Sequence, residues 1–284
     1  MKRKILLPTD FSHNSWLAIK YAVNLYKNEA CDFYILNVFS ATGNLMESLM
    51  NMEPGSELYT MAKEHSKKGL SKTLDQLILD SNSDHKHTFK TISLFNNTIE
   101  GIKQVIEQKD IEMVVMGTKG ETNSRETIFG STAVFVMEKV RNCPVIVVPE
   151  KAKQDLPKEI VFPTSFKTHY KRRELSYLTD IAKKCDASIA ILHVAKSDEL
   201  DQVQKERKEM LEEIFQDVNY SFHMLSNYSV EAAINIFVES RDSDMVAFIN
   251  KKHKFFSSIL TNALVKDIAF HSTVPILVMH DLRN

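Results

Sequence analysis

The stretch IEMVVMGTKGETNSRETIFGSTAVFVMEKVRNCPVIVVPE, residues 111–150, holds three of the chain's seven glycines in a loop that follows a short apolar run. That run, Met113–Met116, and a second one, Val145–Val148, are almost continuous in apolar residues, which is typical of strands buried on both faces of a parallel sheet. A helical stretch, STAVFVMEKVR, lies between the loop and the second run. A strand, a helix and a strand in this order predict an α/β unit.

The same alternation extends toward the amino terminus. Ile5–Leu7 and Phe33–Val38 are further short apolar runs, and residues 14–29 and 98–110 carry apolar side chains at helical intervals. Alternating strands and helices predict a doubly wound α/β architecture with right-handed crossovers.

The chain also repeats itself. KILLPTDFSHNSWLAIKYAVNLYKNEACDFYILNVFS from Lys4 corresponds to EIVFPTSFKTHYKRRELSYLTDIAKKCDASIAILHVAKS from Glu159, and NCPVIVVPE corresponds to TVPILVMHD near the end. Similarity spread over both halves indicates a duplicated domain. The charged segment Pro149–Glu159 has two prolines and no apolar period, so it reads as a linker between domains at 1–150 and 158–284.

Composition limits the function classes. The 36 basic and 37 acidic side chains nearly cancel, which gives no reason to expect nucleic acid or an anionic membrane as partner. Cys31, Cys143 and Cys185 are isolated, as is usual in a reducing compartment. Neither a signal sequence nor an apolar run of membrane-spanning length is evident, so a soluble cytoplasmic protein is expected.

The glycine loop has the spacing Gly117-x2-Gly120-x9-Gly130-Ser131 between the end of a strand and the start of a helix. Glycine permits close approach of a ligand and positive φ, and a helix start offers unpaired N–H groups, so this arrangement suits an anion such as phosphate. The hydroxyls of Ser131 and Thr132 could add donors. Ordinary turn and N-cap roles remain an alternative.

A second candidate element, Pro8-Thr9-Asp10, follows the first strand. With the strand order 3-2-1-4-5 it would face the glycine loop at the topological switch point, where open α/β sheets bind ligands. The alternative for Asp10 is an N-cap or near-cap of the next helix.

These motifs resemble the universal stress protein family, through ILLPTDFS, ILNV, VVMGTKG, FGSTA and PVIVVP. The resemblance implies two tandem flavodoxin-like (adenine nucleotide alpha hydrolase-like) domains, each with a five-stranded parallel sheet of order 3-2-1-4-5. It also implies a site for ATP, with Mg²⁺, in the first domain. By analogy Pro8, Thr9, Asp10, Val38 and Met116 line the adenosine pocket, and Gly117, Gly120, Gly130, Ser131 and Thr132 hold the phosphates.

The second half departs from this pattern. Aligned by strands, Asp10 becomes Ser165, Gly117 becomes Ile249, Gly120 becomes Lys252, and Gly130-Ser131 becomes Thr261-Asn262. We therefore expect one nucleotide site per chain. Family members pair through the last strand of each domain, which implies that PVIVVP and PILVM pair within this chain, with a homodimer as a further option.

The expected function is a stress-response binding module or sensor with an unidentified protein partner. A weak ATPase or self-phosphorylating enzyme using Ser131 or Thr132, and a nucleotide-independent scaffold, are the alternatives. The segment Ser40–Thr60 reads equally well as a lid, a partner-binding segment or a long loop. His85 and His87 share a strand face, where solvation is a commoner explanation than metal binding.

Overall fold

The computed structural model describes residues 2–40, 56–80, 86–118, 130–195, 199–250 and 273–280. In chain order the first half contains β1 (Arg3–Pro8), α1 (His13–Leu25), β2 (Cys31–Phe39), α3 (Glu57–Asp80), β3 (Thr88–Phe95), α4 (Thr98–Lys109), β4 (Met113–Gly117), α5 (Ser131–Lys139) and β5 (Val145–Val148). The second half contains β6 (Glu159–Thr164), α6 (Arg172–Cys185), β7 (Ser188–Ala195), α7 (Gln202–Phe215), β8 (Tyr220–Ser226), α8 (Val230–Arg241), β9 (Met245–Asn250) and β10 (Ile276–His280).

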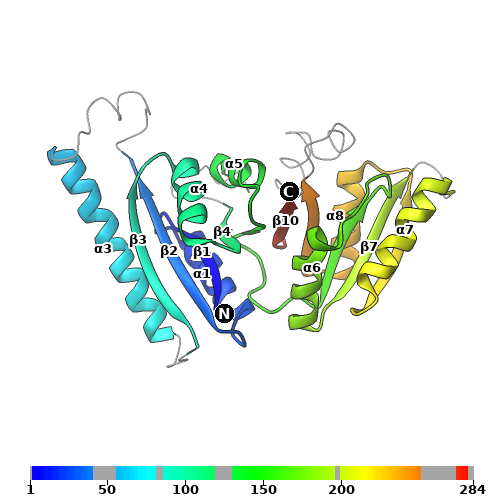
Figure 1. The fold of residues 1–284 in the computed structure, drawn as a ribbon, viewed down its shortest axis with the longest axis horizontal. Coiled ribbons are helices and arrows are strands. Elements are labelled where there is room, and N and C mark those ends of the chain that lie inside the picture. The colour runs from blue at the N-terminus through cyan, green and yellow to red at the C-terminus, as the bar shows by residue number, and fades with distance from the viewer. Residues whose placement is uncertain are drawn as a thin grey trace.

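The strands of the described residues form one ten-stranded sheet in the order β3-β2-β1-β4-β5-β10-β9-β6-β7-β8. Each half contributes five strands in the order 3-2-1-4-5, and all pairings inside a half are parallel. Figure 1 shows the two halves meeting at the centre of the molecule. The prediction of two tandem flavodoxin-like α/β units with this strand order is confirmed.

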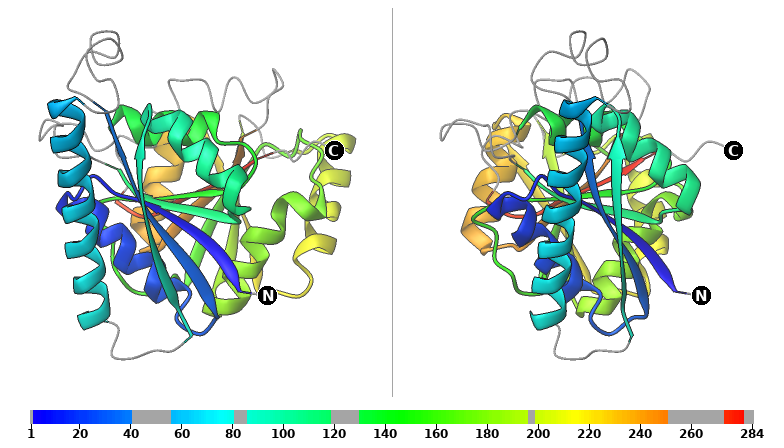
Figure 2. Two further views of the ribbon diagram at one scale, coloured as in Figure 1. Left: turned by 60° about the vertical axis from the view of Figure 1, so that its left-hand side comes forward. Right: turned by 90° about the vertical axis from the view of Figure 1, so that its left-hand side faces the viewer.

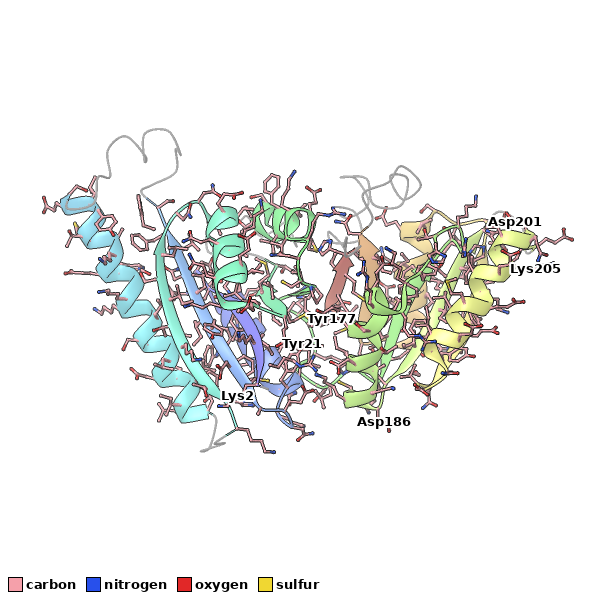
Figure 3. The ribbon with its side chains drawn as sticks, in the orientation of Figure 1. Lys2, Tyr21, Tyr177, Asp186, Asp201 and Lys205 are labelled. Carbon is pink, nitrogen blue, oxygen red and sulfur yellow. The ribbon has the colours of Figure 1, made fainter. Side chains whose placement is uncertain are left out.

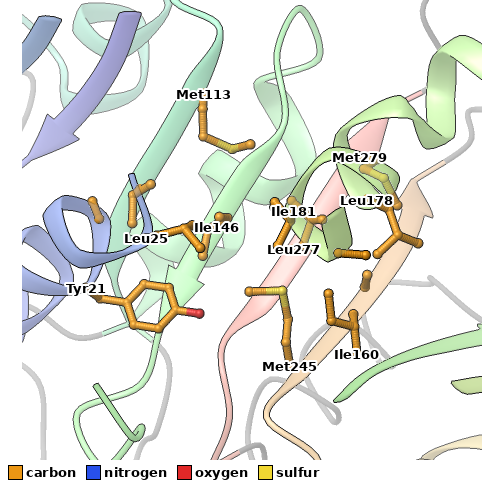
Figure 4. Close-up of a cluster of buried hydrophobic side chains, with 14 of the residues drawn as sticks. Tyr21, Leu25, Met113, Ile146, Ile160, Leu178, Ile181, Met245, Leu277 and Met279 are labelled. Carbon is orange, nitrogen blue, oxygen red and sulfur yellow. The ribbon is translucent and has the colours of Figure 1, made fainter. Parts of the chain in front are cut away.

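The halves are joined by β5 and β10. These strands pair with each other, as the family resemblance implies; the pairing is antiparallel, with Leu277 opposite Ile146. Both strands are completely buried, so neither leaves a free apolar edge in the centre of the sheet. The core continues across this boundary, where Leu25 and Met113 of the first half lie near Ile181 and Met245 of the second (Figure 4).

Helices cover both faces of the sheet (Figure 2). Buried residues of α1, α3, α6 and α7 belong to one apolar cluster, and those of α4, α5 and α8 belong to another. The two clusters lie on opposite faces because successive strand residues alternate between them, as Ile5 and Leu6 do in β1. This layering leaves the carboxyl ends of the strands open between helices, the usual location of ligand sites in such sheets.

A charged network links the halves near the amino end of β1. Arg3 donates two hydrogen bonds to the carboxylate of Asp180 in α6, at 2.8 and 3.3 Å, and its Nε lies 3.0 Å from Glu29. Lys184 forms ion pairs with Glu29 and Asp180 and lies 3.9 Å from the ring centre of Tyr26. Figure 3 shows Tyr21 of α1 and Tyr177 of α6 in the same region between the halves. The ion pairs add a polar connection to the β5–β10 pairing.

Two other expectations concern segments outside the strands. No strand or helix element lies between β5 and β6, in agreement with a linker there, although the domain bounds 1–150 and 158–284 stay a prediction. Of the segment Ser40–Thr60, residues 57–60 begin α3 and residues 41–55 lie outside the described residues. Among the helices in the described part of the chain, none has the length and apolar character needed to cross a membrane.

Candidate functional site

A cavity of about 210 Å³ opens at the carboxyl ends of β1 and β4, the neighbouring strands at the topological switch point of the first half. Nine of the ten predicted site residues line it: Pro8, Thr9, Asp10, Val38, Met116, Gly117, Gly130, Ser131 and Thr132. The tenth, Gly120, lies outside the described residues.

The sequence analysis missed six lining residues: Ser15, Leu36, Thr98, Ile102, Thr118 and Ala133. Two of them had a usable signal, because Thr118 and Ala133 each follow a predicted site residue directly. Leu36 is the register partner of Pro8, so strand pairing brings it to the same place. The contributions of Thr98 and Ile102 depend on how α4 crosses the sheet, which no local pattern specifies.

The loop after β1 is built around the hydroxyl of Thr9. This hydroxyl lies 2.8 Å from Ser15 Oγ and accepts a hydrogen bond from the Phe11 N–H at 3.0 Å. Phe11 has a φ of 68°, a left-handed conformation that is unusual for an aromatic residue. Asn37 donates to the Thr9 carbonyl at 2.8 Å from the neighbouring strand. The end of β1 is therefore fixed from both sides.

Asp10 has a local structural role in addition to its place in the cavity wall. Its carboxylate accepts a hydrogen bond from the Ser12 N–H at 3.1 Å, while Ser12 is the N-cap of α1. The near-cap alternative for Asp10 is thus observed. Asp10 is also the one ionisable side chain among the lining residues that the structure describes.

Gly117 is closely packed against α1. A Cβ atom at this position would lie 3.0 Å from the carbonyl oxygen of Asn14, which is main chain of α1. The Asn14 side chain donates to Thr118 Oγ1 at 3.0 Å, so α1 and the end of β4 are in direct contact. A side chain at position 117 would be in tight contact with the main chain of α1, so packing is a further reason for glycine here beside ligand approach and turn formation.

Gly130 starts α5 at the opposite wall of the cavity. Its φ of −72° and ψ of 154° are open to any residue, so positive φ does not explain this glycine. Its N–H donates to the Thr118 carbonyl at 2.6 Å, and no side chain caps the helix. Ser131 and Thr132 are exposed in the first turn, where helix N–H groups lack intrahelical partners. This wall suits an anion.

The remaining walls are apolar. Leu36, Val38, Ile102 and Met116 contribute aliphatic and thioether surface to the cavity. Gly101 of α4 permits this arrangement, because a Cβ there would approach a methyl group of Val38 to 2.9 Å. The cavity therefore combines an apolar side with an end rich in N–H and hydroxyl groups.

The register of the second half supports the predicted alignment of two residues. Ile160 pairs with Met245 in the second half as Ile5 pairs with Met113 in the first, so Ile249 occupies the place of Gly117. Ser165 likewise follows β6 as Asp10 follows β1. The other aligned positions, Lys252, Thr261 and Asn262, lie outside the described residues.

The second half differs from the first at further positions near the carboxyl end of β6. The hydroxyl of buried Tyr170 hydrogen-bonds Thr164 Oγ1, as Ser15 does to Thr9, so an aromatic ring stands where the first half has a small residue. His193 replaces Asn37, and its Nδ1 lies 2.8 Å from the Thr164 carbonyl. His193 is thus a buried, hydrogen-bonded histidine of the core. Burial lowers the pKa of His193 below its ordinary value.

No group of three or more His, Cys, Asp or Glu side chains in the described ranges is placed to hold a metal ion. His87 does not lie in the solvated setting expected of it. Its ring packs edge-on against Phe33 with centres 5.1 Å apart, and both ring nitrogens are buried. His85 lies outside the described residues.

Comparisons with known proteins agree with this architecture. The model of the universal stress protein family matches residues 1–149. The chain is similar to universal stress protein MJ0577 of Methanocaldococcus jannaschii, 28% identical over 53% of this chain and 97% of that protein. It is also similar to MJ0531 of the same organism, 27% identical over 54% of this chain and 85% of that protein. A crystal structure of a universal stress protein from Archaeoglobus fulgidus superposes with a TM-score of 0.75 over 97% of both chains, at 17% identity.

Proposed function

Because this chain belongs to the universal stress protein family, we propose that it binds one ATP, with Mg²⁺, in the cavity between β1, β4 and α5, and acts as a nucleotide-dependent binding module in a stress response. Pro8, Thr9, Asp10, Val38 and Met116 would surround the adenosine, and Gly117, Gly120, Gly130, Ser131 and Thr132 the phosphates. These residues do not identify the protein partner that recognises the ATP-bound form.

One observation carries this proposal. Nine residues chosen for a nucleotide motif, scattered from Pro8 to Thr132, meet around a single cavity with an apolar wall and the start of α5 opposite it. An adenine ring gains from apolar burial, and phosphate oxygens gain from helix N–H groups and their partial positive charge. This division of the cavity matches the two ends of the ligand.

The lining supports binding more than hydrolysis. The carboxylate of Asp10, the one ionisable group among the described lining residues, already accepts the Ser12 N–H and so has a structural role. General acid–base catalysis requires a positioned proton acceptor near the attacking water. A weak ATPase, self-phosphorylation of Ser131 or Thr132, and a nucleotide-free scaffold are outcomes that the binding experiment below separates.

The proposal assigns one site to each chain. In the second half Ile249 stands in place of Gly117 and Tyr170 in place of Ser15, and both large side chains are buried in the apolar core, so two small residues at the first cavity have no counterpart there. A cytoplasmic location belongs to the same proposal, supported by three cysteines that are all free thiols.

Gly130→Asp provides a direct test. Its backbone angles suit an aspartate N-cap, so α5 should be kept or slightly stabilised, while a carboxylate now competes with phosphate. Gly130→Asn is the matched control with similar shape and no charge. Calorimetric titration with magnesium ATP should give one site in the wild type, retained in the Asn variant and weakened at least about tenfold in the Asp variant, a change of about 1.4 kcal/mol.

The alternatives have distinct results. If neither heat of binding nor co-purified nucleotide is detected, the nucleotide-independent scaffold is the remaining alternative. Steady release of inorganic phosphate that disappears in Asp10→Asn would establish the ATPase. Equal affinity of the Asp and Asn variants would contradict a phosphate position at the start of α5.

A further inference from the structure

The short helix α5 is held at both ends by other parts of the sheet. At its start the Gly130 N–H donates to the Thr118 carbonyl at the cavity. At its other end it meets Asn250, the last residue of β9 in the second half. The Asn250 amide donates to the Met137 carbonyl at 3.2 Å, and Arg141 donates to the Asn250 carbonyl at 2.9 Å. A single residue of the second half thus makes two hydrogen bonds to this region.

These hydrogen bonds lie at the carboxyl end of α5, where main-chain carbonyl groups lack donors within the helix. The last four carbonyl groups of a helix have no intrahelical donors, and Met137 belongs to the last turn of α5. With nine residues α5 is shorter than helices that are stable alone, so packing and end contacts determine its position. The donor that serves the Met137 carbonyl comes from 113 positions further along the chain.

The location of Asn250 in the repeat is informative. By strand register it is the counterpart of Thr118, the residue after Gly117 in the first half. Thr118 Oγ1 accepts a hydrogen bond from Asn14 of its own half, whereas the Asn250 side chain turns to the neighbouring half. The position that lines the cavity in one copy is used in the other copy to contact α5.

We propose that Asn250 is a positioning residue for the nucleotide site of the first half: it holds the end of α5, so that the first turn of this helix stays directed at the cavity. This inference rests on the proposed function. Binding free energies are linked reciprocally, so nucleotide at the start of α5 also strengthens the contact with β9. The degenerate second half is thereby a component of the nucleotide site. It also transmits the effect of nucleotide binding from α5 to β9.

The test compares Asn250→Ala with Asp180→Asn in the full chain. Asp180→Asn weakens the contact between the halves at the opposite end of β1, where Arg3 and Lys184 bind this carboxylate, and leaves α5 untouched. Magnesium ATP affinity is measured by calorimetry, and folding by circular dichroism and thermal melting. We expect three- to tenfold weaker binding in Asn250→Ala, about the loss of one hydrogen bond, and unchanged affinity in Asp180→Asn. Arg141→Met removes the hydrogen bond to the Asn250 carbonyl and should also weaken ATP binding.

Hydrogen exchange provides a readout that general packing would not change. In the wild type, magnesium ATP should slow exchange of amides in α5 and also in β9, and in Asn250→Ala the protection of β9 should be lost. Wild-type affinity in Asn250→Ala, or an equal loss in Asp180→Asn, would overturn the positioning role while the proposed function stands. Absence of ATP binding by the wild type would overturn both the proposed function and the positioning role of Asn250. The titration of the wild type alone detects this outcome.

Discussion

Gly117 lies so close to the main chain of Asn14 that a side chain at position 117 would be in tight contact with it. The contact involves the carbonyl carbon and oxygen of Asn14, at 3.1 and 3.0 Å from an added Cβ, so rotation of a side chain cannot relieve it. A glycine that a sequence motif assigns to ligand binding can therefore also be favoured by packing within the protein.

Gly117→Ala should lower the free energy of unfolding by about 1–3 kcal/mol, since α1 must move away from β4 to admit the methyl group. Urea denaturation measures the change, with Gly130→Asn as a control at a glycine whose backbone angles suit a side chain. Unchanged stability of Gly117→Ala would mean that α1 shifts without cost and that the glycine serves only the cavity.

His193 allows a pH-dependent prediction. Burial lowers its pKa below the ordinary value of 6.5, so as pH falls through this value the unfolded chain takes up the proton first. The stability that neutral His193 contributes is therefore present above about pH 6.5 and is lost as pH falls toward its folded pKa.

His193→Asn is the matched variant, because Asn37 makes the same hydrogen bond to Thr9 in the first half. As pH falls from 7.5 to about pH 5, the unfolding free energy of the wild type should decrease relative to that of the variant, which has no titrating group at this position. His223, whose pKa burial also lowers, is common to both proteins and cancels in the difference. Parallel pH curves would contradict a titrating His193.

At the scale of elements, the strands β1, β2, β4 and β5 and the helices α1, α4 and α5 were predictable because their apolar residues are numerous and regularly spaced. The 24-residue helix α3 was not, since its buried residues are Ser66, Leu70, Thr73 and Leu77, with two large apolar side chains among them. Such a weak apolar face gives little periodic signal. The site residues followed from a motif, but the contacts that shape them, such as Gly101 against Val38, depend on helix crossings.

The helix α3 packs onto the loop of the candidate site through one glycine. A Cβ at Gly69 would lie 2.4 Å from the ring of Phe11, the residue with positive φ after Asp10. Replacing glycine by alanine inside a helix normally stabilises it by about 1 kcal/mol. Here we expect Gly69→Ala to destabilise the protein by about 1–3 kcal/mol, because the ring must move.

A double-mutant cycle with Phe11→Gly isolates this contact. Glycine suits the left-handed conformation at position 11, and with the ring absent Gly69→Ala should return to its ordinary stabilising effect. Urea denaturation of the four proteins gives the coupling free energy. Additive effects of the two substitutions would contradict steric contact between α3 and the loop.

At the scale of the whole molecule, the ten-stranded sheet has unpaired edges at β3 and β8, while β5 and β10 cover each other in the centre. The edge strands carry exposed and partly exposed residues, whereas every residue of β5 and β10 is buried. An apolar strand of this kind is tolerated in the centre of a sheet and is a liability at an edge. The second half is therefore needed to cover β5 whether or not it binds a ligand.

A chain of residues 1–150 should consequently associate with itself. Removal of the second half exposes β5 and the apolar cluster around Ile146, and a second copy can supply an antiparallel β5 in place of β10. Light scattering after gel filtration should give twice the mass of the fragment, against the monomer mass for the full chain. Val147→Lys, which places a charge on the exposed strand, should make the fragment monomeric and less stable. A monomeric, stable fragment that binds magnesium ATP as tightly as the full chain would show that β10 is not required to cover β5, and that the site forms without the second half.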